Sequence, residues 1–347
     1  WPSELQAPDD AWTSVMRGTS RLQLPDPWYQ FLYDAAVRSL LLLSSGDVVP
    51  GPYTYKRFWF RDGCIMLGAL LALGCTGRSR DLLSLFFTRQ KRSGYFQSQK
   101  GEWDSNGQVL WVFERYQQLS GERLPNHWLQ SLFQGAKWIE KKRRSGTRSR
   151  QFPGLLPPGF SAEHLGPNDY YYWDDFWGLA GLQSVARLAG RFGFPEKQKE
   201  FAEQAEDLQR VIERSISDIP DWKKKGGIPA SPNRRLDAGA VGSLVADYPL
   251  QLRPANDPEI SATIEFLFEN CFCLGGFFQD MIHSGVNPYL TLSIAQTMLR
   301  NKDPRYRELI QSIADLASPT GQWPEAVHPI TRGGCMGDGQ HGWAAAE

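Results

Sequence analysis

The feature that most constrains the fold of this 347-residue chain is a strict alternation of two kinds of helical segment. Apolar residues recur at helical spacing along most of the sequence, and no stretch alternates at period two for more than a few residues. One kind of segment is small and apolar on nearly all sides, which is typical of helices buried on both sides. The other kind has a narrow apolar stripe and a wide charged face. Six of each predict an all-α (α/α)6 barrel, with an inner ring of helices inside an outer ring.

Twelve helices are expected, and the barrel is expected to occupy 27–347. The inner helices are predicted at 62–75, 104–120, 173–191, 237–247, 288–301 and from 341 onward, and the outer helices at 27–45, 79–90, 126–144, 196–217, 258–272 and 303–317. The last inner helix has fewer than two turns before Glu347, so we expect it to be truncated. Residues 1–26 are rich in Pro and polar residues, which indicates a leader or the remnant of an upstream segment.

Six long connections rich in Gly, Pro and aromatic residues each lead into an inner helix. They comprise 46–61, 91–103, 146–172, 218–236, 273–287 and 318–340. Because successive inner helices enter the barrel in the same direction, these connections are expected to gather at one end, the mouth. Functional residues are therefore expected there.

Composition narrows the class of partner. Lys plus Arg and Asp plus Glu are 38 each, so no basic excess is available to neutralise a nucleic acid. No run approaches the ~18 apolar residues of a membrane span, so no membrane partner is expected. Five scattered cysteines argue against a disulfide framework and for a reducing compartment, which favours the cytoplasm. Five histidines without zinc-site spacing predict no metal, and no cofactor motif is present.

Paired acids in an aromatic setting are the dominant chemical signal. Asp174 and Asp175 stand at the predicted start of an inner helix, flanked by six aromatic residues within 170–177. Helix capping would explain one aspartate, since a carboxylate accepts the unpaired N–H groups of a first turn. It does not explain the aromatic rings, which exclude water and raise a carboxyl pKa as a general acid requires. We therefore favour a catalytic role for this pair.

Two further acid and aromatic clusters lead into inner helices. Glu325 follows Trp323 and Pro324, and Pro324 prevents it from lying deep in a regular helix. Arg61 and Asp62 follow three aromatic residues at 58–60. The structural alternative for Glu325 is an exposed turn, and the alternative for Arg61 and Asp62 is a helix cap with a neighbouring ion pair.

Together these residue types fit glycoside hydrolysis, in which one carboxylic acid protonates the leaving oxygen and a second carboxylate activates water. Aromatic faces stack on sugar rings, and the expected walls are Trp59, Trp103, Trp173 and Trp323. Polar side chains bind hydroxyl groups, for which we expect Arg61, Asp62 and Asp104, with His341 and Trp343 also facing the substrate. Asp174 is the expected acid, with Asp175 as its alternative, and Glu325 is the expected base, with Glu347 as its rival.

The motifs resemble those of the six-hairpin glycosidases, and most of all glycoside hydrolase family 15, the glucoamylases. Residues 59–62 are similar to the family's W-x-R-D, whose Arg and Asp hold the sugar beside the cleaved bond. Residues 173–175 resemble its W-E-E, which maps the proton donor onto Asp174. Residues 287–289 resemble its N-P-W, and Glu325 with 342–346 resembles the loop of the catalytic base and the following W-S-x-A. The resemblance implies an inverting hydrolase of an oligo- or polysaccharide, with an α-glucoside favoured.

Two departures leave the sugar open. The acid is Asp where the family has Glu, and the stretch 275–280 lacks the Arg that grips glucose in the family. Two alternatives therefore stay open. A phosphorylase would need basic residues in the mouth, where Arg234, Arg235 and Arg332 are the obvious ones. A non-catalytic barrel that binds carbohydrate or regulates an enzyme would keep the tryptophans without needing the acids.

Overall fold

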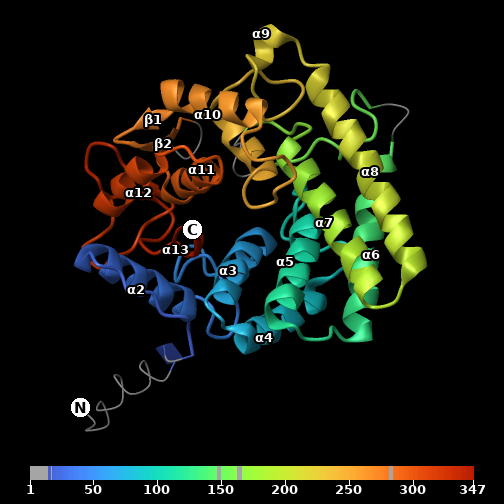
Figure 1. The fold of residues 1–347 in the computed structure, drawn as a ribbon, viewed down its shortest axis with the longest axis horizontal. Coiled ribbons are helices and arrows are strands. Elements are labelled where there is room, and N and C mark those ends of the chain that lie inside the picture. The colour runs from blue at the N-terminus through green and yellow to red at the C-terminus, as the bar shows by residue number, and fades with distance from the viewer. Residues whose placement is uncertain (1–14, 17, 147–149, 162–165, 281–283) are drawn as a thin grey trace.

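The computed structural model of the chain describes residues 15–16, 18–146, 150–161, 166–280 and 284–347. Its helices form two concentric rings, which confirms the predicted (α/α)6 barrel (Figure 1). The inner ring consists of α3 (Phe60–Ala72), α5 (Ser105–Ser120), α7 (Tyr172–Arg191), η3 (Ala238–Ala246), α11 (Pro288–Arg300) and α13 (Gly342–Ala346). The outer ring consists of α2 (Pro27–Leu42), α4 (Thr76–Phe86), α6 (Asn126–Arg144), α8 (Pro195–Ser217), α10 (Pro258–Asn270) and α12 (Tyr306–Asp315).

The burial of the two kinds of helix follows the sequence pattern. In the outer helix α8, the buried residues follow a single stripe at spacings of three and four: Phe201, Ala205, Leu208, Ile212 and Ile216. In the inner helix α3, the polar Arg61 and Asp62 are buried along with the apolar residues. A helix enclosed by neighbours has no solvent face, so even its charged residues must find partners inside the protein.

One inner segment differs from the expected α-helix. Residues Ala238–Ala246 form the 3-10 helix η3, and all nine residues are buried. The segment contains Gly239 and Gly242, which have low helix propensity, and the side chain of Asp237 accepts a hydrogen bond from the Gly239 N–H. A chain rich in small residues thus adopts the tighter helix at this position.

The mouth connections contain elements that periodicity did not predict. They hold the short helix α9 (Asp221–Lys224), while the 3-10 helix η1 (Phe87–Arg89) forms the end of the outer helix predicted at 79–90. The connections also form an antiparallel sheet in the order β1 (Phe272–Cys273), β2 (Gly276–Gln279), β3 (Gly285–Val286), β4 (Ala326–Val327) and β5 (Gly334–Met336). These strands were missed because each has only two to four residues, too few for an alternating pattern. The sheet joins the connection before α11 to the connection before α13.

The leader predicted at 1–26 falls partly outside the described residues, which omit 1–14 and 17. The helix α13 spans five residues, compared with 13 in α3 and in α11. It contacts both α3 and α2 and so joins the end of the ring to its beginning. All five cysteines lie in the described part of the chain and all are free. No helix of the described residues is long and apolar enough to cross a bilayer.

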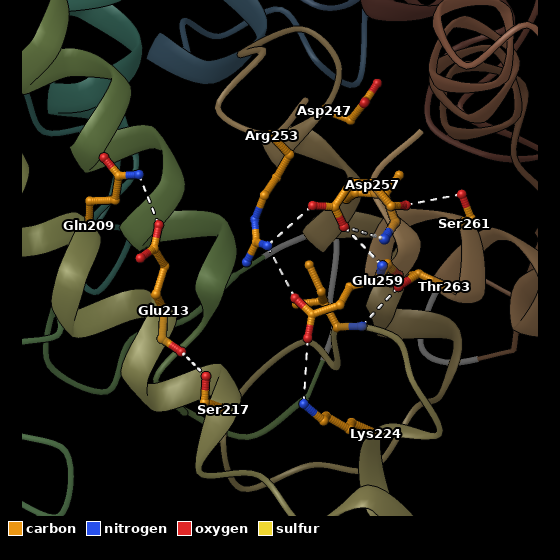
Figure 2. A network of polar contacts seen from close by, with 12 residues as sticks. Gln209, Glu213, Ser217, Lys224, Asp247, Arg253, Asp257, Glu259, Ser261 and Thr263 are labelled. Carbon is orange, nitrogen blue, oxygen red and sulfur yellow. Dashed lines mark hydrogen bonds and ion pairs between the residues drawn. The ribbon is translucent and has the colours of Figure 1, made fainter. Parts of the chain in front are cut away.

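Outer elements are joined to one another by ionic contacts. Figure 2 shows Arg253 bridging Asp257 and Glu259 at distances of 3.3 and 3.1 Å, and Lys224 reaching Glu259 from α9. Asp257 also caps α10, because its Oδ1 accepts the N–H groups of Glu259 and Ile260. This carboxylate is only 6% exposed. It is thus a buried aspartate with a purely structural set of partners.

Two glycines allow α5 and α7 to pack closely. A Cβ added at Gly107 would lie 2.1 Å from the Trp177 carbonyl oxygen, and one at Gly181 would lie 2.6 Å from the Gly107 Cα. We expect Gly107→Ala to lower the free energy of unfolding by about 3 kcal/mol, because the clashing atoms are backbone atoms that cannot move aside. Urea denaturation measures the loss. The control is Gly77→Ala in α4, where a Cβ meets nothing within 4 Å and should stabilise by ~0.5–1 kcal/mol. Equal effects of the two changes would contradict this packing.

Candidate active site

Arg61, Asp62, Asp104, Asp174 and Asp175 lie at the N-terminal ends of inner helices. Arg61 and Asp62 stand in the first turn of α3, and Asp104 is the N-cap of α5. Asp174 and Asp175 stand in the first turn of α7. His341 is the N-cap of α13, and Glu325 immediately precedes β4. The helices of the inner ring thus bring to one end of the barrel residues that are up to 280 positions apart in the sequence (341 − 61).

Asp104 links three of these helices. Its Oδ2 accepts the indole N–H of Trp173 at 2.8 Å and the amide of Gln108 at 3.1 Å, and it lies 3.4 Å from Nη1 of Arg61. The same Nη1 lies 3.4 Å from Oε1 of Glu102. Sequence reasoning missed Glu102, although its place in a mouth connection beside Trp103 could have drawn attention to it. The result is a buried cation held between two buried carboxylates.

Asp174 is a carboxyl group whose burial is not offset by hydrogen bonds. It is only 1% exposed, and within the described residues neither of its oxygens has a hydrogen-bond partner. Burial raises its pKa well above the ordinary value, and repulsion from the neighbouring carboxyl groups of Asp104, Asp175 and Glu102, where these are ionised, raises it further, while Arg61 lowers it. Burial thus favours the protonated form of Asp174, and its orphaned oxygens leave the position open for a polar ligand.

Asp175 lies in a different environment, although it is the next residue. Its Oδ1 accepts the backbone N–H of Leu156 at 2.8 Å. Burial raises its pKa to about 8, while the Leu156 N–H, Arg143 and Arg150 act in the opposite direction. Those groups belong to α6 and to the connection before α7. Consecutive helical residues point about 100° apart, so Asp174 is directed toward the mouth acids and Asp175 toward the outer ring.

The raised pKa of Asp175 predicts a pH-dependent stability. Between its ordinary pKa of 3.8 and about 8, the folded protein keeps a proton that the unfolded chain releases, so stability falls as the pH rises. Asn does not titrate, and its amide oxygen can still accept the Leu156 N–H. We expect Asp175→Asn to stabilise the protein at pH 9 relative to pH 5 by at least about 1.4 kcal/mol, the value of one pKa unit. Thermal unfolding at both pH values measures this, and a change that is the same at both would contradict it.

Glu325 lies beside a tyrosine hydroxyl. Oε2 of Glu325 accepts the Tyr55 hydroxyl at 2.5 Å, and the glutamate is 9% exposed. Burial and the hydrogen bond to Glu325 raise the pKa of Tyr55 above its ordinary range, so the phenol remains a donor. Tyr55 also contacts the rings of Trp59 and His341, with centroids 5.8 and 6.1 Å away. Sequence reasoning missed Tyr55, although it stands in the mouth connection 46–61.

Asp62 and His341 belong to the same group of buried side chains at the mouth as Asp104, Asp174 and Glu325, which we call the acid group. Nε2 of His341 is 4.0 Å from Oδ1 of Asp62. Burial raises the pKa of Asp62 to about 6, with Arg61 opposing the shift and Glu325 adding to it. Burial lowers the pKa of His341 to about 4, so its ring is neutral at physiological pH. A neutral imidazole can both donate and accept hydrogen bonds, as recognition of a hydroxyl group requires.

Aromatic rings surround the acids on several sides. The Trp343 ring lies 6.2 Å from Trp173 and 4.4 Å from Tyr289, and the Arg57 guanidinium lies 4.3 Å from the ring of Trp59. Trp103 is half-buried, with the Lys142 ammonium 3.7 Å from its ring. Tyr289 is a further aromatic residue that sequence reasoning assigned only to a motif.

Two predicted residues lie apart from this group. The Trp323 indole donates to the Ile313 carbonyl of α12 at 2.7 Å, and its ring lines an apolar groove of about 390 Å³ beside α2. The structure therefore does not bring Trp323 to the acids. Glu347 accepts hydrogen bonds from Trp343, Ser293 and Gln296 on α13 and α11, and burial raises its pKa to about 7. These three hydrogen bonds already occupy the carboxylate of Glu347, the rival base.

Within the described part of the chain, no group of three or more His, Cys, Asp or Glu side chains has the arrangement of a metal site. The basic run at 141–150 also has structural partners where it is described. Arg143 and Arg144 pair with Glu140 and Asp207, and Arg150 donates to the carbonyls of Lys142 and Arg143 at the end of α6. Residues 147–149 lie outside the described residues.

Comparison with solved structures identifies the architecture. A wild-type glycosidase aligns with a TM-score of 0.71 at 15% identity, covering 93% of this chain and 96% of its own. The chain has the six-hairpin glycosidase fold. A glucoamylase from Saccharomycopsis fibuligera aligns with a TM-score of 0.71 at 11% identity, covering 93% of this chain and 94% of its own. A bacterial glucoamylase complexed with acarbose gives 0.69 at 15% identity, covering 97% of this chain and 56% of its own. No family model and no curated protein sequence matches the chain.

Proposed function

We propose that the protein is a glycoside hydrolase that uses Asp174 as general acid and Glu325 as general base. The observation that carries the proposal is the contrast between these two carboxyl groups at one barrel mouth. Asp174 is buried in a setting that favours its protonated form and has no hydrogen-bond partner among the described residues, whereas Glu325 accepts a hydrogen bond from the Tyr55 hydroxyl. Glycosidases keep two carboxyl groups in different protonation states by giving them different environments.

In this reaction the Asp174 carboxyl group donates its proton to the glycosidic oxygen as the bond to the anomeric carbon breaks. Glu325 accepts a proton from the attacking water, which adds its oxygen to the anomeric carbon. Tyr55 fixes the orientation of the Glu325 carboxylate. Because both steps are proton transfers between carboxyl groups, water and sugar, the reaction requires no cofactor. The two groups are assigned to opposite faces of the sugar, which makes the mechanism inverting.

The proposed substrate is a neutral oligo- or polysaccharide. Arg61, Asp62 and His341 offer both donors and acceptors for hydroxyl groups, and Asp104 and Glu102 hold Arg61 in place. The rings around the acids can stack on the apolar faces of sugars. An α-glucoside is favoured, because two of the aligned structures are glucoamylases and the W-x-R-D and N-P-W resemblances point the same way.

The acidic mouth favours water over phosphate as the acceptor. A phosphorylase needs cations to bind its phosphate. Arg61 already lies between two carboxylates, and Arg234 is paired with Asp237 at 2.6 Å. The orphaned carboxyl group of Asp174 favours catalysis over binding alone, because a buried polar group without partners costs stability and gains nothing in a passive module.

A substrate panel tests the proposal. Purified protein is incubated with α- and β-linked aryl glycosides and gluco- and manno-oligosaccharides, each with and without inorganic phosphate. We expect release of free sugar from at least one α-glucoside and no sugar phosphate. Phosphate-dependent release of a sugar 1-phosphate would support the phosphorylase, and carbohydrate binding without turnover would support a non-catalytic barrel. Either result would overturn the proposal.

A further inference from the structure

A carboxylate outside the acid group holds the loop that presents Tyr55. Asp338 follows β5 in the connection before α13, and it accepts three consecutive backbone N–H groups. These are the N–H groups of Tyr53 at 3.2 Å, Thr54 at 2.8 Å and Tyr55 at 3.1 Å. Asp338 is 7% exposed. Although burial acts in the opposite direction, the three donors lower its pKa, so it stays ionised.

Glycines on both loops make this contact sterically possible. A Cβ at Gly51 would lie 2.1 Å from Oδ2 of Asp338. A Cβ at Gly337 would lie 2.7 Å from the ring of Tyr55 and 3.4 Å from the Cβ of Glu325, and Gly337 has a positive φ of 66°. The two loops therefore approach each other at van der Waals distance on both sides of the carboxylate.

The same two loops carry the pair that we assign to base catalysis. Tyr55 stands in one loop, and Glu325 stands in the other, immediately before β4, which pairs with β5. Asp338 thus fixes the backbone of the donor, and the β4–β5 pair fixes Asp338 relative to the acceptor. A hydroxyl that must meet a carboxylate oxygen at 2.5 Å requires such fixed backbones at both ends.

We propose that Asp338 is a positioning residue for the general base, which it serves by holding the Tyr53–Tyr55 backbone so that the Tyr55 hydroxyl points at Glu325. The inference rests on the proposed role of Glu325. Asp338 touches neither the acid group nor any atom assigned to the reaction, and its effect passes through Tyr55. Besides Tyr55 and Asp338, the titratable and charged groups around Glu325 include, among the described residues, Asp62 of α3, Arg61 through its effect on Asp62, His341 before α13, and Cys335 of β5.

The proposal predicts that Asp338 and Tyr55 act as one unit. Asp338→Ala and Tyr55→Phe should each lower kcat by about 100-fold with little change in KM, the cost of a catalytic group displaced by about 1 Å. The double variant should be no slower than the slower single variant, because each change removes the same oriented hydroxyl. Asp338→Asn, which keeps one acceptor oxygen, should recover part of the lost kcat.

The pH profile provides a readout that a purely structural role would not move. A hydrogen bond donated to a carboxylate favours its ionised form, so its loss should move the acidic limb of the kcat/KM profile to higher pH in both single variants. The matched control is Asp257→Ala, which removes an aspartate of similar burial that also accepts backbone N–H groups, at the start of the outer helix α10 (Figure 2). Asp257→Ala should lower thermal stability and leave kcat and the acidic limb unchanged.

A spectroscopic measurement separates this proposal from the proposed function. With 3-fluorotyrosine placed at position 55, the 19F chemical shift should differ from that of free fluorotyrosine in the native protein and move toward it in Asp338→Ala. This result is independent of turnover, so it stands even if no glycoside is hydrolysed. If Asp338→Ala does not fold, Gly51→Ala tests the same contact, because its Cβ meets the Asp338 carboxylate. An unchanged 19F shift, multiplicative losses in the double variant, or an unmoved acidic limb would overturn the proposal.

Discussion

Replacement of Asp174 by Asn is expected to lower kcat/KM by about 10³- to 10⁴-fold, the contribution of a general acid. The amide cannot donate a proton to the leaving oxygen. Folding should not suffer, since the described structure gives neither carboxyl oxygen a hydrogen-bond partner. Steady-state kinetics on the substrate found in the panel, with thermal unfolding of the same sample, measures both effects.

The leaving group distinguishes lost acid catalysis from a damaged site. A glycosyl fluoride needs little protonation, so Asp174→Asn should be impaired far less on the fluoride than on an oligosaccharide. The matched control is Asp175→Asn, which changes the neighbouring carboxyl group in the same way and should retain activity within about 10-fold of the native protein, because Asp175 faces Leu156 rather than the acids. Equal losses in the two variants, or equal losses on both substrates, would contradict the assignment of Asp174.

Replacement of Glu325 by Gln is expected to lower kcat by about 10⁴-fold, at the upper end of the range for a general base. Without the carboxylate no group accepts the proton of the attacking water, and this need is the same for every leaving group. The loss should therefore be equal on the fluoride and on the oligosaccharide, while ligand binding measured by calorimetry is retained.

The control for Glu325 is Glu347→Gln, which tests the rival base. Glu347 accepts hydrogen bonds from Trp343, Ser293 and Gln296, so its replacement should weaken packing around Trp343 and change kcat by less than about 10-fold. A larger loss of turnover in Glu347→Gln than in Glu325→Gln would transfer the role of base to Glu347.

The sequence predicted the barrel because its helices differ in how they are buried. The stripe at Phe201, Ala205 and Leu208 in α8 marks an outer helix, and the broadly apolar α3 marks an inner one. The five short strands and the 3-10 geometry of η3 were not predicted. Segments of two to four residues carry no period, and their conformation is set by loops that meet only in the folded barrel.

The candidate site could be predicted in part. A position at the start of an inner helix predicted that Asp174 and Arg61 lie at the mouth, and a position in the connection to the last inner helix predicted the same for Glu325. The same signal misplaced Trp323, whose backbone stands in a mouth loop while its side chain packs against α12. Tyr55 and Asp338 were not predicted as site residues, because their contact joins two connections about 280 residues apart in the sequence (338 − 55 = 283). A local sequence pattern does not predict a contact between such distant residues.

The most direct test of the central claim is the stereochemistry of the first product. Hydrolysis of the best substrate is followed by 1H NMR within minutes of mixing, before mutarotation, and the anomeric signal of the released sugar is assigned. Acid catalysis by Asp174 with water activated by Glu325 on the opposite face predicts the inverted anomer, β-glucose from an α-glucoside. Release of the retained anomer, or no release from any glycoside by the folded protein, would contradict the account.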